Sequence, residues 1–471
     1  MIITQLSIDY LLYLFIGTIT LTLVLDFLKE KARPLNFVLS ILATVGGIAF
    51  LMIGVDGNLL VLDTYAKVFA GIFLFSVLII LPALYSELWD VTRSGVFTGL
   101  ILASVLGTII AVTSRNLILI VVGWELASIS SYALVGIRRR DKISTEAAMK
   151  YFLVGAVGSG LIFFGLSLIF GATASLDLLK IAEVITSGTY DQVLARVGIL
   201  IFSAGIGFKL AIVPFHVWIP DVYEGAPNSV TSYLAAVSKG MAFAVAIRVF
   251  YQAFLPIKEF WAPIFAILAI ITMTYGNLAA LVQEKMKRML AWSSIAHAGY
   301  MLIALGAPGT SPVVIIGAIF HVLTHAFMKI TSFVAARGVT DITGTDLIDD
   351  YMGLRRIAPG TSASLTIMML SLAGIPPLAG FWSKYYIFLG AVENGYPLLA
   401  LIGVINSVIS LFYYARVIKN IYVEESPKEG VTRGIKIGYA APIAILTILV
   451  LVLGIYPTPL FEILEKSVAI F

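Results

Sequence analysis

The stretch RVGILIFSAGIGFKLAIVPFHVWIPD, residues 196–221, decides the fold. Its apolar run is long enough to cross a bilayer as a helix, which takes about 20 residues. Lys209 lies inside this run, and Pro214 and Pro220 interrupt it. A proline removes a backbone donor and clashes with the preceding turn of a helix. We therefore expect a transmembrane helix that is broken near the middle of the membrane, with a buried positive charge beside the break.

The rest of the chain has the same apolar character. Hydrophobic residues make up 60% of its 471 residues, charged residues only 12%, and the mean hydropathy is +1.00. An ordinary soluble domain holds about 25% charged residues. Only helices and closed barrels satisfy the backbone in hydrocarbon, and these apolar runs are too long and uniform for barrel strands. The composition predicts an all-α integral membrane protein that crosses the bilayer many times.

We expect about 14 transmembrane helices. The apolar segments lie at 8–28, 35–55, 66–88, 95–113, 116–137, 144–171, 193–218, 227–251, 261–283, 289–306, 312–337, 361–392, 398–419 and 436–457. The twelfth segment contains Pro376 and Pro377, with Lys384 just beyond them. We therefore expect segments 7 and 12 to be broken in the same way.

Features of segments 4–8 recur in segments 9–13. Trp124 and Tyr132 are eight residues apart, and so are Trp292 and Tyr300. A Met-Lys pair, the proline break and an Arg-Val pair also recur in corresponding segments. Five helices are an odd number, so the second unit starts on the other side of the membrane and the two five-helix repeats are inverted. Inverted repeats with discontinuous helices are typical of proteins that move ions near the midplane.

The repeat predicts four parts of the chain. These are three N-terminal transmembrane helices (1–92), a first antiporter-like repeat (93–251), a second, inverted repeat (252–420) and a C-terminal transmembrane helix (421–471).

Positive charges predict the orientation in the membrane. Of the 31 Lys and Arg residues, 19 lie in odd-numbered loops and six in even-numbered loops. Cytoplasmic loops carry the excess of Lys and Arg. We therefore expect the odd loops in the cytoplasm and both termini outside.

The ionisable residues inside the segments are the candidate functional residues. They are Lys150, Lys209, Lys239, Lys329 and Lys384, with Glu125 and the four histidines His216, His297, His321 and His325. A charge at the bilayer centre costs several kcal/mol, so such residues face the bundle interior and mark a pathway. Spacings of four place His321, His325 and Lys329 on one helical stripe.

Structural alternatives stay open for several of these residues. Lys150 and Lys329 could snorkel to the interface or end a helix. Glu125 could form a structural ion pair, and His216 or His297 could be an ordinary core histidine.

The chemistry predicted from these residues is proton transfer. Burial disfavours the charged form of a lysine and a neighbouring carboxylate favours it. A row of such lysines, bridged by histidines and water, could pass protons, with Glu125 as an electrostatic switch. We find no Walker loop and no haem or flavin signature, and the absence of cysteine excludes iron–sulfur ligands and disulfides. Gly155–Gly160 (GAVGSG) lies inside an apolar segment, where it predicts close helix packing. The driving energy must come from a partner or an ion gradient.

Several stretches resemble the antiporter-like membrane subunits of respiratory complex I and its relatives. They include WELASISSYALVG (124–136), FKLAIVPFHVWIPDVYEGAPNSV (208–230), NLAALVQEKMKRMLAWSSIAHAGYMLIALG (277–306) and SLAGIPPLAGFWSKYYIF (371–388). The resemblance implies that Glu125 and Lys209 are the coupled pair of a first half-channel. It implies that Lys239 connects the two half-channels and that Lys384 is the exit-side lysine of the second.

The subfamily is indicated by two features. A lysine at 384 favours the NuoN type, subunit N of NADH-quinone oxidoreductase, over the NuoM type. The stretch HVLTHAFMKITSFVAARG (321–338) is instead similar to other antiporter-type subunits, including those of Mrp-type sodium/proton antiporters. The chain shows no long lateral helix after segment 14, so it does not resemble the NuoL type.

The resemblance therefore implies a proton-translocating, non-redox subunit of a complex-I-like oxidoreductase. We expect no cofactor or metal in this chain, and quinone, iron–sulfur clusters and flavin in partner subunits. Other antiporter-like and small membrane subunits would be its neighbours in the cell membrane of a bacterium or archaeon. The net charge of +4 gives no indication of nucleic-acid binding. The rivals are a subunit of an Mrp-type Na⁺/H⁺ antiporter, a passive scaffold of the membrane arm and, more remotely, a solute transporter. The electron donor and the coupling ion stay open.

Overall fold

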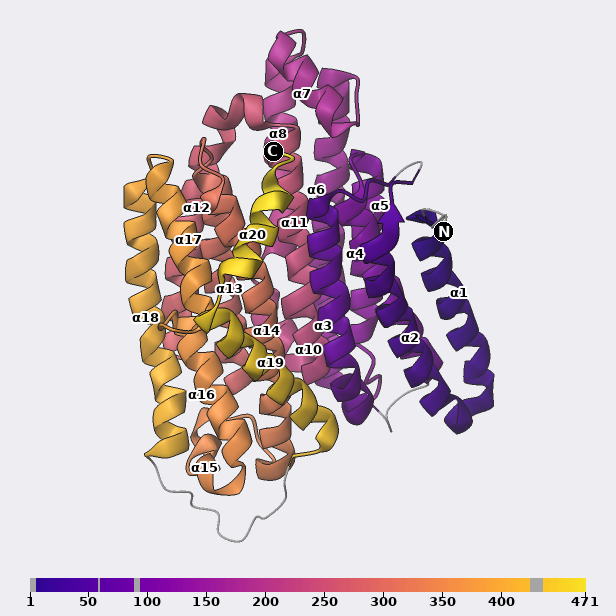
Figure 1. Cartoon of the computed structure of the whole chain (residues 1–471), viewed down its shortest axis with the longest axis vertical. Coiled ribbons are helices and arrows are strands. Elements are labelled where there is room, and N and C mark those ends of the chain that lie inside the picture. The colour runs from indigo at the N-terminus through magenta and orange to yellow at the C-terminus, as the bar shows by residue number, and fades with distance from the viewer. Residues whose placement is uncertain (1–5, 58–59, 89–93, 424–434) are drawn as a thin grey trace.

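The protein is a bundle of long helices that run side by side (Figure 1). The computed structural model describes residues 6–57, 60–88, 94–423 and 435–471. Within these residues, 13 helices are long and apolar enough to cross a membrane. The expected segment 12 is also present, as two shorter helices, α16 (Pro359–Ala373) and α17 (Ala379–Glu393). The predicted all-α membrane architecture is confirmed.

The N-terminal part contains three long helices and a small feature that the sequence did not predict. Its elements are β1 (Leu6–Ser7), α1 (Asp9–Leu25), η1 (Asp26–Lys31), α2 (Ala32–Ile53), β2 (Gly54–Val55) and α3 (Thr64–Leu88). The two short strands pair in parallel and join the ends of α1 and α2. Each strand is only two residues long, with β1 just before Asp9 and β2 just before Asp56, so neither leaves an apolar signal of its own.

The two repeats supply most of the bundle. The first holds α4 (Ser94–Thr113), α5 (Leu117–Val135), α6 (Lys142–Thr173), α7 (Leu178–Ser187), α8 (Gln192–Leu210), α9 (Ile219–Gly225), α10 (Asn228–Tyr233), the π-helical turn η2 (Leu234–Ser238) and α11 (Lys239–Gln252). The second holds η3 (Leu255–Ile257), α12 (Lys258–Leu281), α13 (Met286–Gly306), α14 (Val313–Thr343), η4 (Ile348–Tyr351), α15 (Leu354–Ile357), α16, α17 and α18 (Pro397–Tyr422). The chain ends with α19 (Ile437–Ile455) and α20 (Thr458–Val468).

Corresponding segments of the two repeats pack in similar pairs. In the first repeat α4 packs against α5, and α6 packs mainly against α8, the half of segment 7 before its proline break. In the second repeat α12 packs against α13, but α14 packs mainly against α17, the half of segment 12 after its proline break. Glycines bring the backbones together in both. A Cβ on Gly123 of α5 would lie 2.6 Å from Gly107 O of α4, and a Cβ on Gly299 of α13 would lie 2.5 Å from Met273 N of α12. The internal repeat is therefore visible in packing as well as in sequence.

Both predicted helix breaks are present. α8 ends at Leu210, and eight irregular or turn residues that include Pro214 separate it from α9. Pro376 and Pro377 lie between α16 and α17, after Gly374, whose φ of 88° suits glycine. Pro220 does not break a helix: it lies in the first turn of α9, where a missing N–H costs nothing.

The glycine-rich run at 155–160 packs closely at two of its three glycines. A Cβ on Gly155 would overlap the Tyr132 hydroxyl, and one on Gly158 would lie 3.2 Å from Phe208, whereas Gly160 faces open space. The predicted close packing is confirmed for the first two positions.

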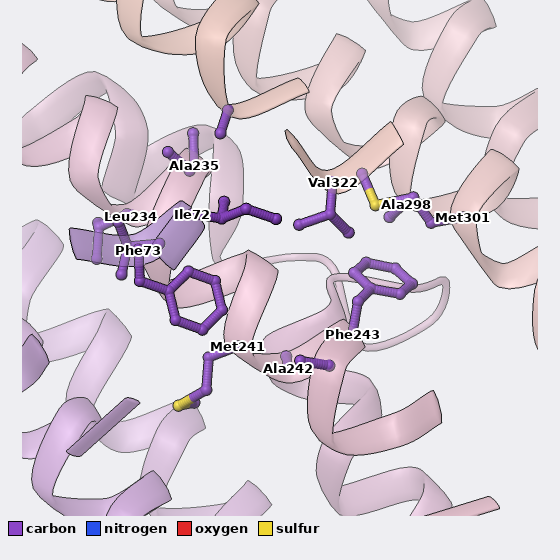
Figure 2. Close-up of a cluster of buried hydrophobic side chains, with 14 of the residues drawn as sticks. Ile72, Phe73, Leu234, Ala235, Met241, Ala242, Phe243, Ala298, Met301 and Val322 are labelled. Carbon is purple, nitrogen blue, oxygen red and sulfur yellow. The ribbon is translucent and has the colours of Figure 1, made fainter. Parts of the chain in front are cut away.

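The centre of the bundle is apolar and fully packed around η2 and α11. Figure 2 shows side chains of α3, α11, α13 and α14 meeting there, among them Phe73, Phe243, Met301 and Val322. A Cβ on Gly240 would lie 2.9 Å from Phe73. Lys239, the neighbour of Gly240, is therefore placed next to a dry core, where its charge needs specific partners.

Candidate functional site

The first part of the site lies between α5, α6 and α8. Lys209, at the end of α8, is 1% exposed, and its Nζ donates to Ser128 Oγ 2.5 Å away. The same Nζ lies 5.8 Å from the centre of the Trp124 ring. Glu125 accepts a hydrogen bond from Ser159 of α6 at 2.6 Å. The lysine and the carboxylate thus have different hydrogen-bond partners and interact through space.

Hydroxyl groups lead from Lys209 toward Lys239. Ser131, one turn after Ser128 on α5, lies 3.3 Å from the Tyr151 hydroxyl. Tyr151 also interacts with Ser238, the residue before Lys239. The sequence analysis singled out none of these three hydroxyl residues, because each is an ordinary component of an apolar segment.

Lys239 lies at the junction of the π-helical turn η2 and α11. π-Helical turns inside helices are frequent at functional sites. Lys239 is 3% exposed, and its Nζ donates to Ser294 O of α13 at 2.8 Å. Because η2 and α11 belong to the first repeat and α13 to the second, Lys239 is a direct contact between the repeats, as the resemblance implied.

The second repeat contains a continuous chain of hydrogen-bonding groups across α14, α13, α18 and α17. At one end, Lys329 Nζ donates to Ser293 Oγ at 2.7 Å, and Ser293 bonds to the Tyr414 hydroxyl. The Tyr414 hydroxyl lies 3.2 Å from His297 Nε2, and His297 Nδ1 lies 2.8 Å from His321 Nε2. At the other end, His321 Nδ1 lies 2.8 Å from Ser383 Oγ. A hydroxyl group or a neutral imidazole both donates and accepts. Each link between the two ends of this relay can therefore take up a proton on one side and release one on the other.

Lys384 follows Ser383 at the end of the relay. Its Nζ donates to Leu372 O at 2.8 Å and to Ser407 Oγ at 2.7 Å, and it lies 4.6 Å from the centre of the Tyr300 ring. A groove of about 610 Å³ between α17 and α18 reaches Lys384 and Ser407. The lysine is therefore held by oxygen atoms at the base of an otherwise apolar groove.

Three of the predicted residues are not part of this chain of hydrogen bonds. Lys150 is not a buried charge: its side chain is 44% exposed and pairs with Glu146 and Asp221 at 2.8 Å. It lies at the end of an extended apolar run, so hydropathy alone placed it in the bilayer. His325 is buried, but its Nε2 has no hydrogen-bond partner within the described part of the chain. The stripe of His321, His325 and Lys329 is therefore not one continuous chain of hydrogen bonds. His216 lies in the break after α8 and packs its ring against aromatic side chains.

Two of the basic residues in the loop count are buried inside the protein. Lys287, in the first turn of α13, is 7% exposed, and Arg248, in α11, is 0% exposed. Without these two residues, the number of Lys and Arg residues falls by one in the odd loops and by one in the even loops. The excess of positive charge in the odd loops therefore remains. Of the residues in that count, Arg93, Lys428 and Arg433 lie outside the described residues.

Two buried carboxylates were missed because each lies at the edge of an apolar segment. Glu87 accepts hydrogen bonds from Arg138 and from the first turn of α10. Asp63 accepts two hydrogen bonds from Arg248, at 2.9 and 2.7 Å. Burial works to raise the pKa of Asp63, but the Arg248 guanidinium holds it below its usual range. Both carboxylates are fully paired, which is typical of structural ion pairs.

The fold and this arrangement define a class of protein: a polytopic helical membrane protein whose buried lysines and histidines lie within two repeats with broken helices. Within the described residues, no group of three His, Asp or Glu side chains could hold a metal ion. Comparison with known proteins gives the family. Residues 114–410 match the family described as NADH:quinone oxidoreductase/Mrp antiporter, TM, and the chain belongs to this family.

Curated relatives are subunit N proteins, as the resemblance in the sequence indicated. The chain is 39% identical to F(420)H(2) dehydrogenase subunit N of Methanosarcina mazei, over 86% of this chain and 84% of that protein. It is 38% identical to NADH-quinone oxidoreductase subunit N 2 of Sorangium cellulosum, over 92% and 90% of the two chains.

Solved structures of similar fold are chains of multi-subunit complexes. A chain of respiratory complex I from Thermus thermophilus has a TM-score of 0.81 and 29% identity, with 96% of this chain and 98% of that chain covered. A chain of the archaeal membrane-bound sulfane sulfur reductase has a TM-score of 0.87 and 25% identity, with coverages of 98% and 96%. A chain of the Mrp complex from Dietzia sp., with a TM-score of 0.86 and coverages of 97% and 96%, is only 19% identical and shares the fold.

Proposed function

We propose that this chain moves protons across the cell membrane as the N-type subunit of a complex-I-like oxidoreductase and carries out no electron transfer itself. The observation that carries the proposal is the relay from Lys329 to Ser383. It crosses four helices of the second repeat, and Lys384 follows at its end. A structural ion pair would not need such a series of groups that each donate and accept.

The proton route would use both repeats. Lys209 and Glu125 would form the first half-channel, and Lys239 would connect it to the second through α13. Lys329, His297, His321 and Lys384 would carry the proton onward, with the groove beside Lys384 as the exit. The roles of Lys150, His216 and His325 would be secondary, since none of them is a link in the chain of hydrogen bonds. The boundaries 93–251 and 252–420 are the division that we propose for the two half-channels.

The driving energy would come from partner subunits. Moving one charge against 100 mV costs about 2.3 kcal/mol. We propose that quinone, iron–sulfur clusters and flavin reside in those partners. Other antiporter-like and small membrane subunits would lie beside this chain. Both termini would face the outside of a bacterial or archaeal cell membrane. A charge change next to Glu125 would alter the field at Lys209, because the two groups interact through space.

Sodium/proton antiport in an Mrp-type complex is the second candidate function. The stripe His321, His325 and Lys329 on α14 favours it, since this stretch is similar to antiporter subunits of that type. The subunit N relatives at up to 39% identity favour the first candidate. Chains that co-purify decide between them: quinone-site and iron–sulfur subunits support the oxidoreductase, and small antiporter subunits without them support the antiporter.

Replacement of the buried lysines tests proton translocation. In the purified complex, reconstituted in vesicles and driven by its own electron donor, Lys209→Ala and Lys384→Ala should each abolish most proton pumping per assembled complex. Loss of a positioned proton-transfer group typically costs about 10²-fold or more in rate. Lys180→Ala, at an exposed position on α7, is the control and should pump normally. Intact pumping by both buried-lysine variants would instead favour a passive scaffold.

A further inference from the structure

The turn between α9 and α10, residues 224–229, is held from one side by a buried lysine of the second repeat. Lys287, in the first turn of α13, donates from Nζ to Glu224 O and to Ala226 O, each at 2.7 Å. Lys287 is 7% exposed, and within the described residues its Nζ forms no ion pair within 4.0 Å. Its charge is therefore stabilised by the backbone carbonyls of this turn and, through space, by Asp346.

A buried glutamate of α3 holds the same turn from the other side. Glu87 accepts from Asn228 N at 3.0 Å, and from Ser229 N at 2.8 Å and Ser229 Oγ at 2.5 Å. Its side chain is fully buried and also pairs with Arg138 at 3.0 Å. A carboxylate at the first N–H groups of a helix interacts favourably with them and with the helix dipole. Carbonyls at one end of the turn thus face a positive charge, and N–H groups at the other end face a negative charge.

The turn connects two elements that carry proposed proton-transfer lysines. The broken helix α8–α9 before it carries Lys209, and α10, η2 and α11 after it carry Lys239. The helix that holds the turn, α13, also carries the relay: Lys329 donates to Leu290 O, one turn beyond Lys287, and to Ser293. A shift of the turn would therefore change the geometry of both repeats.

We propose that Lys287 and Glu87 are positioning residues, which clamp the turn 224–229 between them and so align the first-repeat lysines with the relay on α13. The proposal rests on the proton-translocating function proposed above. Neither residue carries the translocated proton. Their effect is exerted through the backbone of the turn and reaches Lys239 and its contact with Ser294 O.

If Lys287 had only a structural role, the outcome would be different. In that case each variant would lose assembly and pumping in proportion, and the pumping rate per assembled complex would not change. Under the proposal, the rate per assembled complex falls, because a displacement of about 1 Å in a reacting geometry can cost about 10²-fold.

The test uses the complete purified complex in vesicles, with proton pumping and the amount of assembled complex measured together. Lys287→Met should lower pumping per assembled complex by about tenfold or more. Lys287→Arg, which keeps a charged donor for the two carbonyls, should recover at least half of the rate. Lys285→Met is the matched control, since Lys285 lies two residues away, is 48% exposed and pairs with Glu224 at the surface; it should pump within about twofold of wild type.

The double variant keeps the proposal falsifiable if Lys287→Met fails to assemble. Lys287→Met with Glu87→Gln removes two contacts with the same turn, so its loss of assembly should be smaller than the sum of the single losses. Its pumping per assembled complex should stay below half of wild type, because the turn is no longer clamped. Wild-type pumping by the double variant would overturn the proposal, and so would wild-type pumping by Lys287→Met. If Lys209→Ala and Lys384→Ala also pump normally, the proposed function has failed; if they do not, only the clamp has failed.

Discussion

At the scale of single residues, Tyr414 joins Ser293 to the histidines of the relay. Its hydroxyl bonds to Ser293 on the Lys329 side and to His297 on the other side. The sequence analysis did not single it out, because a tyrosine in an apolar segment is usually a core residue with a satisfied hydroxyl. Its importance follows from its position on α18, where its hydroxyl connects two residues of α13, Ser293 and His297.

Tyr414→Phe should interrupt proton transfer with little effect on packing. The substitution removes one oxygen atom and leaves the ring in place, so the complex should assemble while pumping falls by about tenfold or more. The measurement is proton pumping per assembled complex in vesicles. Tyr251→Phe in α11 is the control: it removes a buried tyrosine hydroxyl that donates to Ala304 O at 2.6 Å, outside the relay. Equal losses in the two variants would contradict a special role for Tyr414.

At the scale of helices, the contact between α14 and α17 sets the last link of the relay. A Cβ on Gly317 of α14 would overlap the Ile387 backbone, and a Cβ on Gly390 of α17 would overlap the Val314 backbone. Small residues let two helices approach closely in a membrane. This close approach places Ser383 of α17 2.8 Å from His321 of α14.

Gly317→Ala should push α17 away from α14 and lengthen the link between His321 and Ser383. We expect pumping to fall several-fold or more and the assembled complex to become less stable, because overpacking typically costs 1–3 kcal/mol. Thermal unfolding in detergent and vesicle pumping measure the two effects. Gly360→Ala in α16 is the control: no atom lies within 4 Å of its added Cβ, so neither quantity should decrease.

The loop after α14 contains a carboxyl group whose charge state should affect stability. Burial raises the pKa of Asp346 to about 6, and the nearby Lys287 charge offsets part of the effect. Because the pKa of Asp346 in the folded protein lies above its ordinary value of 3.8, folding disfavours the charged form. The cost is absent below about pH 4 and grows until the pH passes about 6.

Asp346→Asn should therefore stabilise the protein at neutral pH and have little effect at pH 4. The amide keeps an acceptor for the Lys287 N–H, which the carboxylate now binds at 3.3 Å. The apparent unfolding temperature of variant and wild type, measured from pH 4 to pH 8, should diverge as the pH rises. A difference that is constant over this range would contradict the raised pKa of Asp346.

At the scale of the whole molecule, the bundle has two chemically different ends. One end holds the ion pairs of Lys150, Arg288 and Lys285 with carboxylates of α9. The other end holds the pair of Asp63 with Arg248 and the small projecting helix α7 (Figure 1). The excess of Lys and Arg in the odd loops predicts that the first end faces the cytoplasm.

Single-cysteine labelling tests this orientation directly, because the natural chain contains no cysteine. In intact cells, an impermeant thiol reagent should label Ser187→Cys at the end of α7 and should not label Arg140→Cys in the loop after α5. Inverted membrane vesicles should give the reverse pattern. Labelling of Arg140→Cys in intact cells would place the termini inside.

The sequence by itself determined the helical architecture, both helix breaks and most of the buried ionisable residues. Hydrocarbon requires that the backbone be satisfied within each segment, and proline cannot satisfy it, so these features follow from local composition alone. The repeat could also be read from the sequence, because the same residues recur at the same spacing in both halves. Lys209, Lys239, Lys329 and Lys384 are all buried, as expected.

Only the tertiary structure decided which of these residues touch. His297 and Tyr414 are 117 positions apart, and their hydrogen bond depends on how each helix is rotated in the bundle. Segments that are apolar on every side carry little periodicity, so they do not tell which face points inward. For the same reason hydropathy could not tell that Lys150 reaches the surface while Lys287 is buried. Those differences arise from contacts between helices, which no single segment contains.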